Sequence, residues 1–209
     1  MARTIISPLY FPGVGNESRK MHPLVPITAE EHGVEILLAY ATADNFTGKP
    51  VYAPAAGCWL HAEAAPLLRK AVALARPLGL SLRILDAFRP AEAQWALWNH
   101  TPDPEFLADP HRGSTHSRGV AVDLDLLDTA SGQALDMGTA FDAFTPLSHH
   151  AVTGVSVEAQ RNRLLLLGLM NAAGWDFYAN EWWHYQMHAA ARFPLLSDTV
   201  LGAERMMRE

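Results

Sequence analysis

The chain has 209 residues, enough for one ordinary domain, and its 49% apolar and 18% charged residues exclude a largely disordered protein. Its 16 basic and 22 acidic residues give a formal net charge of −6, which argues against nucleic acid or an anionic membrane as the main partner. One cysteine and ten histidines exclude an internal disulfide and a cysteine-rich zinc site, so that histidines and carboxylates must hold any transition metal.

The predicted elements mix helices and strands without a regular alternation. Residues 1–27 are rich in proline and are expected to form an irregular arm on a single domain that covers residues 1–209. Helices are expected at 61–78, 91–99 and 157–173, strands at 81–87, 119–127 and 182–187, a loop at 101–113 and a turn at 128–132. This order favours an α+β fold over a doubly wound parallel sheet.

The N-terminus does not read as a secretion signal, because Pro8 and Pro12 interrupt its short apolar stretch. The longest apolar run, from Leu164 to Met170, is far shorter than the ~20 residues that span a membrane. The single Cys58 agrees with a reducing compartment and is expected to be a buried structural thiol. We therefore expect a cytoplasmic protein with neither a membrane nor a nucleic acid as partner.

Two segments hold residues suited to metal chemistry, STHSRGVAVDL at 114–124 and EWWHY at 181–185. The sequence has no HExxH, GxGxxG, P-loop or GxSxG motif, which removes the common zincin, nucleotide and serine-hydrolase interpretations. A catalytic zinc typically has three protein ligands and a water molecule. His116, Asp123 and His184 would supply these ligands, and Glu181 would remain as a base. The alternative is a structural Asp123 that pairs with an arginine or with backbone donors.

The seven-residue separation of His116 and Asp123 restricts how both can reach one metal. On an unbroken strand they would face opposite sides, and on a helix they would lie about 10 Å apart along the axis. We therefore expect the chain to turn between them at Gly119.

The same argument applies to Glu181 and His184, which are three residues apart. Glu181 is expected in the loop before a strand that contains His184. Trp183 and Tyr185 are then expected to face away from the metal and to pack in the core.

At these residues the sequence resembles the D-alanyl-D-alanine dipeptidases, zinc enzymes of vancomycin-resistance type in peptidase family M15. The family pattern SxHSRGxAxDL followed by EWWHY is present without a gap. Further matches follow in order over residues 40–185, at 40–50, 86–90, 137–142 and 148–150. The resemblance implies an α+β fold with a central antiparallel sheet flanked by helices, as in Hedgehog-like and D,D-peptidase domains. It also implies one Zn²⁺ per chain and hydrolysis of D-Ala-D-Ala to two D-alanines.

The resemblance implies a role for each matching residue. His116, Asp123 and His184 match the zinc ligands, and Glu181 matches the general base and acid. Arg89 matches the arginine that stabilises the transition state. Tyr40 and Asp142 match residues near the substrate ammonium, and Ser114 matches a serine near the substrate carboxylate. Without the resemblance, Arg89 could pair with Asp86, Tyr40 could pack in the core, and Asp142 could cap the turn around Gly138. We expect His149 and His150 to be structural or to support the site from outside it.

Two other functions fit the same motifs. One is a D,D-carboxypeptidase or endopeptidase that acts on longer peptidoglycan peptides in a cavity open at one end. The other is a zinc-binding, Hedgehog-like module without catalysis, which the presence of Glu181 and Arg89 disfavours. For the dipeptidase we expect a role in cell-wall peptide metabolism or glycopeptide resistance.

Overall fold

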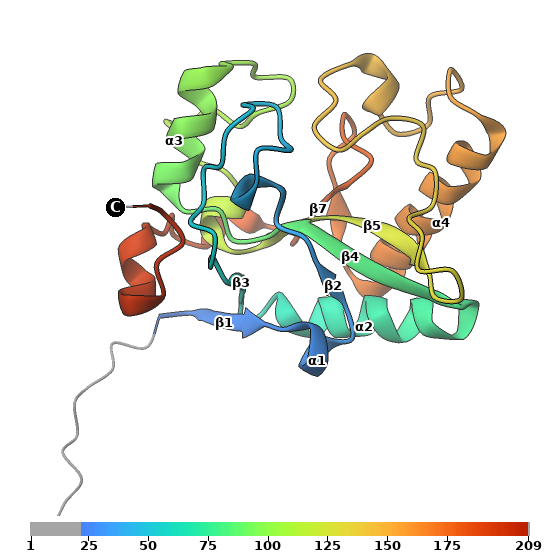
Figure 1. The fold of residues 1–209 in the computed structure, drawn as a ribbon, viewed down its shortest axis with the longest axis horizontal. Coiled ribbons are helices and arrows are strands. Elements are labelled where there is room, and N and C mark those ends of the chain that lie inside the picture. Colours follow the sequence, from blue (N-terminus) through green and yellow to red (C-terminus); the bar gives the residue numbers. More distant parts are fainter. Residues whose placement is uncertain (1–21, 209) are drawn as a thin grey trace, which may run out of the picture.

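A five-stranded sheet is the framework of the computed structural model, which describes residues 22–208 (Figure 1). Its strands, in spatial order, are β2 (Glu35–Ile36), β4 (Leu80–Asp86), β5 (Ala121–Asp128), β7 (His184–Gln186) and β6 (Asp176–Phe177). β2 and β4 are parallel, and the other neighbours are antiparallel. The predicted α+β class is confirmed, and the predicted antiparallel sheet is corrected to a mixed sheet with one parallel edge.

A second, two-stranded sheet joins β1 (Leu24–Ile27) to β3 (Cys58–His61). Residues 1–21 of the expected arm lie outside the described residues, and the part that is described forms a strand instead of irregular chain. Leu24 and Ile27 are buried in the core, and Pro26 is tolerated because β1 has only one hydrogen-bonded neighbour.

The helices α2 (Ala65–Ala75) and α4 (Val157–Ala173) pack on each other and on the sheet. The bounds of α4 are those predicted, because Ser156 caps its first turn and Gly174, with φ of 106°, ends it. The predicted helix at 61–78 is shorter, since His61 belongs to β3 and residues 76–78 form a 3₁₀ turn at Pro77. The remaining α-helices of the described chain are α1 (Ala29–His32) and α3 (Ala91–His100).

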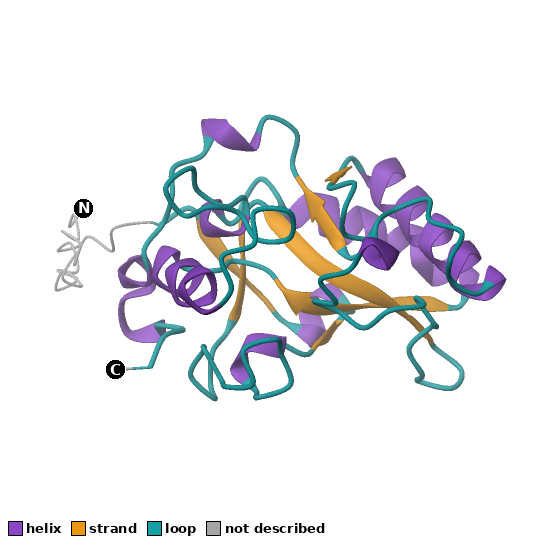
Figure 2. Cartoon of the chain, turned by 90° about the horizontal axis from the view of Figure 1, so that it is seen from above, coloured by secondary structure: helices purple, strands orange, loops and turns teal. Residues whose placement is uncertain are grey.

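The two faces of the sheet differ in what covers them. In Figure 1 the loops around residues 40–50 and 137–150 lie on the opposite side of the sheet from α2, and Figure 2 shows loops that lie over the sheet when the molecule is seen from above. Along β5, alternation places Leu124 and Leu126 in the apolar core and leaves Asp123 and Asp125 on the loop side. None of the described helices has the length and apolar character needed to cross a membrane.

Candidate metal centre

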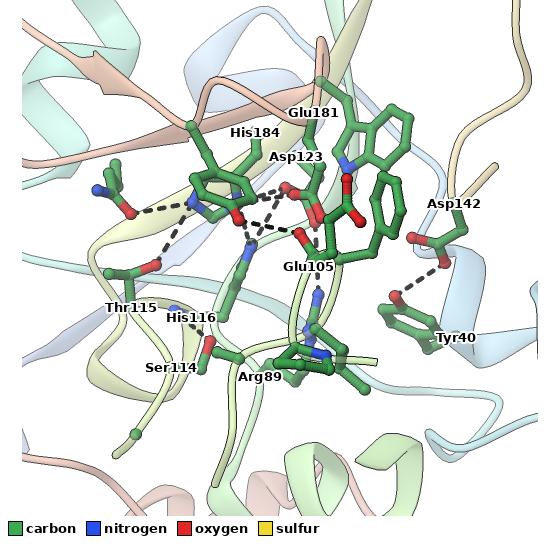
Figure 3. A pocket seen from close by; sticks show the side chains of 18 residues that line it. Tyr40, Arg89, Glu105, Ser114, Thr115, His116, Asp123, Asp142, Glu181 and His184 are labelled. Atoms are coloured by element: carbon green, nitrogen blue, oxygen red, sulfur yellow. Dashed lines mark hydrogen bonds and ion pairs between the residues drawn. The ribbon is translucent and has the colours of Figure 1, made fainter. Parts of the chain in front are cut away.

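Three side chains converge on one point at the loop side of the sheet (Figure 3). The Nε2 atom of His116 lies 3.0 Å from Nδ1 of His184, and Oδ1 of Asp123 lies 3.2 Å and 3.0 Å from these two atoms. All three residues are buried. Ligands about 2.0 Å from a tetrahedral zinc would be about 3.3 Å apart, so this triangle has nearly the dimensions of one face of a zinc site.

The outer contacts of the two imidazoles turn their lone pairs toward this point. Nδ1 of His116 donates to the carbonyl oxygen of Ala87 at 2.7 Å, which leaves Nε2 unprotonated. Nε2 of His184 lies 3.1 Å from Oε1 of Gln186, which as an acceptor leaves Nδ1 unprotonated. Two lone pairs and a carboxylate that face one another repel unless a proton or a metal ion lies between them, and this set of donor atoms fits a metal ion.

The sequence brings these ligands together by a turn and by strand register. His116 lies in the 3₁₀ turn His116–Arg118, and Gly119, with φ of 70°, redirects the chain into β5. In the pairing of β5 with β7, Asp123 lies directly opposite His184. The predicted turn at Gly119 is confirmed. Burial alone would raise the pKa of Asp123, but the adjacent His116 and His184 outweigh it and hold this pKa well below its usual range.

Glu181 lies in the loop before β7, as predicted, and is buried beside the three ligands. Its Oε2 is 3.8 Å from Nδ1 of His184. Burial, with the nearby carboxylates of Asp123 and Asp142, raises the pKa of Glu181 well above its usual range. A carboxylate in such surroundings is suited to take up a proton near neutral pH.

The aromatic residues beside Glu181 differ in part from the prediction. Tyr185 is fully buried in the core, as expected. Trp183 is buried in the core as expected, but it also lines the pocket instead of facing away from it, because β7 begins only at His184 and the strand alternation does not extend to residue 183.

Arg89 is buried and contacts two carboxylates. It pairs with Asp86, and it is also the arginine that lies next to Asp123. Its Nε donates to Oδ2 of Asp86 at 2.8 Å, and its Nη2 lies 3.4 Å from Oδ2 of Asp123. The Tyr52 hydroxyl donates to the other oxygen of Asp86 at 2.8 Å. Arg89 also lines the pocket, so one ion pair holds its side chain while Nη2 stays close to the metal ligands.

Tyr40 and Asp142 form a pair at one end of the pocket, and Ser114 lies toward the other (Figure 3). The Tyr40 hydroxyl donates to Oδ2 of Asp142 at 2.9 Å. Burial raises the pKa of Asp142 to about 8. Asp142 also has a positive φ of 57°, a backbone conformation that is uncommon for residues other than glycine. Ser114 is buried, and its Oγ accepts a hydrogen bond from the His116 amide.

These residues surround a cavity of about 240 Å³. One wall consists of residues 104–108, which the sequence predicted only as part of a loop. Tyr178 and Gln186 also line the cavity and were not predicted. Tyr178 reaches the cavity through a contact with the distant Glu105, which no local pattern predicts, and Gln186 lies just beyond the EWWHY motif.

The two histidines of the 148–150 motif lie apart from the metal ligands. Nε2 of His149 is 3.2 Å from a carboxylate oxygen of Glu105, at the same wall. The ring of His150 packs edge-on against Phe177. Both positions agree with a supporting role outside the ligand set.

Comparison with known proteins identifies the family. The peptidase M15 model, described as D-Ala-D-Ala dipeptidase, matches residues 18–201. A D-alanyl-D-alanine dipeptidase of Escherichia coli is 47% identical over 165 residues, which cover 79% of this chain and 84% of that protein. One from Enterococcus faecium is 36% identical over 173 residues, with 74% and 86% covered. A solved vancomycin-resistance D,D-pentapeptidase in complex with Zn(II) is 16% identical, with a TM-score of 0.42 and coverage of 70% of this chain and 85% of that one. The chain belongs to the D-Ala-D-Ala dipeptidase family of metallopeptidases, peptidase family M15, as its motifs predicted.

Proposed function

We propose that this protein hydrolyses D-alanyl-D-alanine to two D-alanines, with one Zn²⁺ held by His116, Asp123 and His184. The observation that carries the proposal is the convergence of three buried acceptors beside the buried carboxylate of Glu181. Imidazole and carboxylate ligands suit zinc, and three protein ligands leave a position for water, as in catalytic zinc sites. A role in cell-wall peptide metabolism or glycopeptide resistance would follow from this activity.

Bound zinc supplies Lewis-acid polarisation of the peptide carbonyl and of a water molecule. Glu181 takes the proton of the attacking water and later gives it to the leaving amine, for which its raised pKa is suited. Nη2 of Arg89 donates to the oxygen on which negative charge develops. Asp86 holds the guanidinium in place during this step through its 2.8 Å contact.

The two ends of the cavity suit the two ends of a free dipeptide. Asp142, supported by Tyr40, accepts the substrate ammonium, whose positive charge lowers the raised pKa of this carboxyl and favours its ionised form. Ser114 with nearby backbone amides binds the carboxylate. The cavity of about 240 Å³ is smaller than the about 300–1,000 Å³ typical of pockets for drug-sized ligands. Its size and its acidic end favour a dipeptide over a longer peptidoglycan peptide.

The experiment that tests this proposal compares two substrates. The purified protein is incubated with D-Ala-D-Ala and with a stem pentapeptide that ends in D-Ala-D-Ala, with and without a chelator. We expect D-alanine to be released from the dipeptide but not from the pentapeptide. The chelator should abolish this release. Hydrolysis of the pentapeptide but not of the dipeptide would favour a D,D-carboxypeptidase, and zinc binding without hydrolysis of either would favour a non-catalytic module.

A further inference from the structure

Gln94, on α3, joins Arg89 to the pocket wall formed by residues 104–108. Its side chain is only 1% exposed, and its Oε1 accepts a hydrogen bond of 3.0 Å from Nη1 of Arg89. Its Nε2 donates a hydrogen bond of 2.7 Å to the carbonyl oxygen of Ala108. Because a guanidinium can only donate and a carbonyl oxygen can only accept, these two partners fix the orientation of the amide.

The contact with Gln94 completes the support of the guanidinium. Asp86 holds Nε, and a guanidinium with this contact alone could still tilt about it. The second contact, from Nη1 to Gln94, fixes the plane of the group. Nη2 is then directed toward Asp123 and the pocket. Gln94 itself does not line the pocket, so any effect on the reaction must pass through Arg89 or through the wall.

The wall has other attachments, which involve Glu105 and Phe106. The Tyr178 hydroxyl donates to the carbonyl oxygen of Glu105 at 2.9 Å, and the Glu105 side chain, which is 50% exposed, faces His149. Phe106 stacks on Phe144 with ring centroids 5.2 Å apart. The bond from the buried amide of Gln94 to Ala108 instead attaches the last residue of the wall to the group that holds Arg89.

We propose that Gln94 is a positioning residue, which aligns Arg89 with the reacting carbonyl and ties the pocket wall to the same guanidinium. The proposal deepens the proposed function and rests on it. The position of the wall and the alignment of the arginine are then coupled through one buried amide. The neutral amide makes this connection without adding a further charge to a site that already holds several carboxylates.

The test compares Gln94→Met, which keeps the length of the side chain and removes both hydrogen bonds, with Leu97→Ala on the same helix. Leu97 is buried but does not line the pocket. For Gln94→Met we expect kcat on D-Ala-D-Ala to fall about 10–100-fold with zinc content unchanged, because small displacements of a catalytic group have effects of this size. For Leu97→Ala we expect a lower melting temperature and a kcat within about twofold of the wild type.

Two further measurements separate a positioning role from a structural one. In an Arg89→Lys background, which removes the Nη1 donor, Gln94→Met should lower kcat by less than about twofold. Hydrogen exchange of residues 101–113 should be faster in Gln94→Met in either background, since the wall has lost its hydrogen bond to Gln94. An unchanged kcat in folded Gln94→Met, an equal loss in the Arg89→Lys background, or unchanged exchange would each overturn the proposal. The exchange measurement does not depend on activity. An inactive wild type would therefore contradict the proposed function, while hydrogen exchange would still test whether Gln94 holds the wall.

Discussion

Nε2 of His116 and Nδ1 of His184 face each other at 3.0 Å, and each ring has its other nitrogen engaged with an oxygen acceptor, the Ala87 carbonyl for His116 and the Gln186 side chain for His184. When both imidazoles are neutral, neither facing nitrogen carries a proton and no hydrogen bond joins them. The pair is stable only when a cation lies between the rings or when one ring is protonated. Metal binding should therefore stabilise the folded protein and release protons from the site.

The first prediction concerns Asp123 and its neighbour on the same face of β5. Asp123→Asn should weaken zinc binding by more than about 100-fold, because changes to outer contacts alone typically cost about 10–100-fold. Asp125→Asn is the matched control, since Asp125 pairs with Arg83 at 2.6 Å and is not one of the converging ligands. Metal analysis after dialysis and the zinc dependence of the melting temperature measure the difference. Equal zinc retention in the two variants would contradict the assigned ligand set.

The second prediction separates the proton-transfer role of Glu181 from metal binding. Glu181→Gln should lower kcat about 10²–10⁴-fold, the range typical for loss of a general acid–base group. The zinc content should stay at the wild-type level, since Glu181 is not one of the three converging ligands. Steady-state kinetics on D-Ala-D-Ala together with metal analysis give both quantities. Loss of zinc in parallel with activity would show that Glu181 acts as a ligand and not as the base.

The third prediction concerns the acidic end of the cavity. Asp142→Asn should raise KM for D-Ala-D-Ala about 10-fold or more, because a charge-assisted hydrogen bond to the ammonium contributes about 1.5–3 kcal/mol. Tyr40→Phe removes only the hydroxyl that supports Asp142, and its effect on KM should be smaller. The wild type should not hydrolyse an N-acetylated dipeptide, which has no ammonium. Rapid hydrolysis of that blocked substrate would refute ammonium recognition by Asp142.

Local signals explain which parts of this fold could be predicted. The cap at Ser156 and the terminator at Gly174 give α4 its predicted bounds, and the odd spacing of His116 and Asp123 requires the turn found at Gly119. The three candidate ligands and Glu181 belong to two short motifs that antiparallel pairing brings together, whereas Arg89, Tyr40 and Asp142 come from further segments that match the family.

The parts that could not be predicted depend on partners far along the chain. The strand β1 forms in a proline-rich stretch because β3 pairs with it about thirty residues later. The parallel edge of the sheet at β2 has only two residues, too few for a periodic pattern. The wall at 104–108 and its attachment to Gln94 arise from tertiary contacts, which a loop sequence does not encode locally.

The fourth prediction is a loss of stability in mild acid. Burial, with the nearby positive charge of Arg163, lowers the pKa of His150 from 6.5 to about 4. Between these two pH values the unfolded chain therefore binds more protons than the folded protein. The contribution of neutral His150 to the free energy of unfolding is present above pH 6.5 and is lost as the pH falls toward 4. His150→Phe keeps an aromatic ring beside Phe177 and should reduce the fall in melting temperature between pH 7 and pH 5. An identical pH dependence in the two proteins would contradict this assignment.

The fifth prediction tests the turn that brings His116 and Asp123 together. Gly119→Ala places a side chain at a φ of 70°, and its Cβ would lie 2.5 Å from Cδ2 of Leu24. We expect a loss of about 1–3 kcal/mol in the free energy of unfolding, and weaker zinc binding because both ligands flank the strained turn.

Gly168→Ala is the matched control for this turn. Gly168 lies inside α4, and a Cβ there meets no atom within 4 Å. The added methyl group should stabilise the protein by about 0.5–1 kcal/mol, since alanine favours helices more than glycine does. Urea denaturation measures both free energies, and zinc titration measures the metal site. Gly119→Ala with wild-type stability and zinc affinity would show that the ligands do not depend on this backbone conformation.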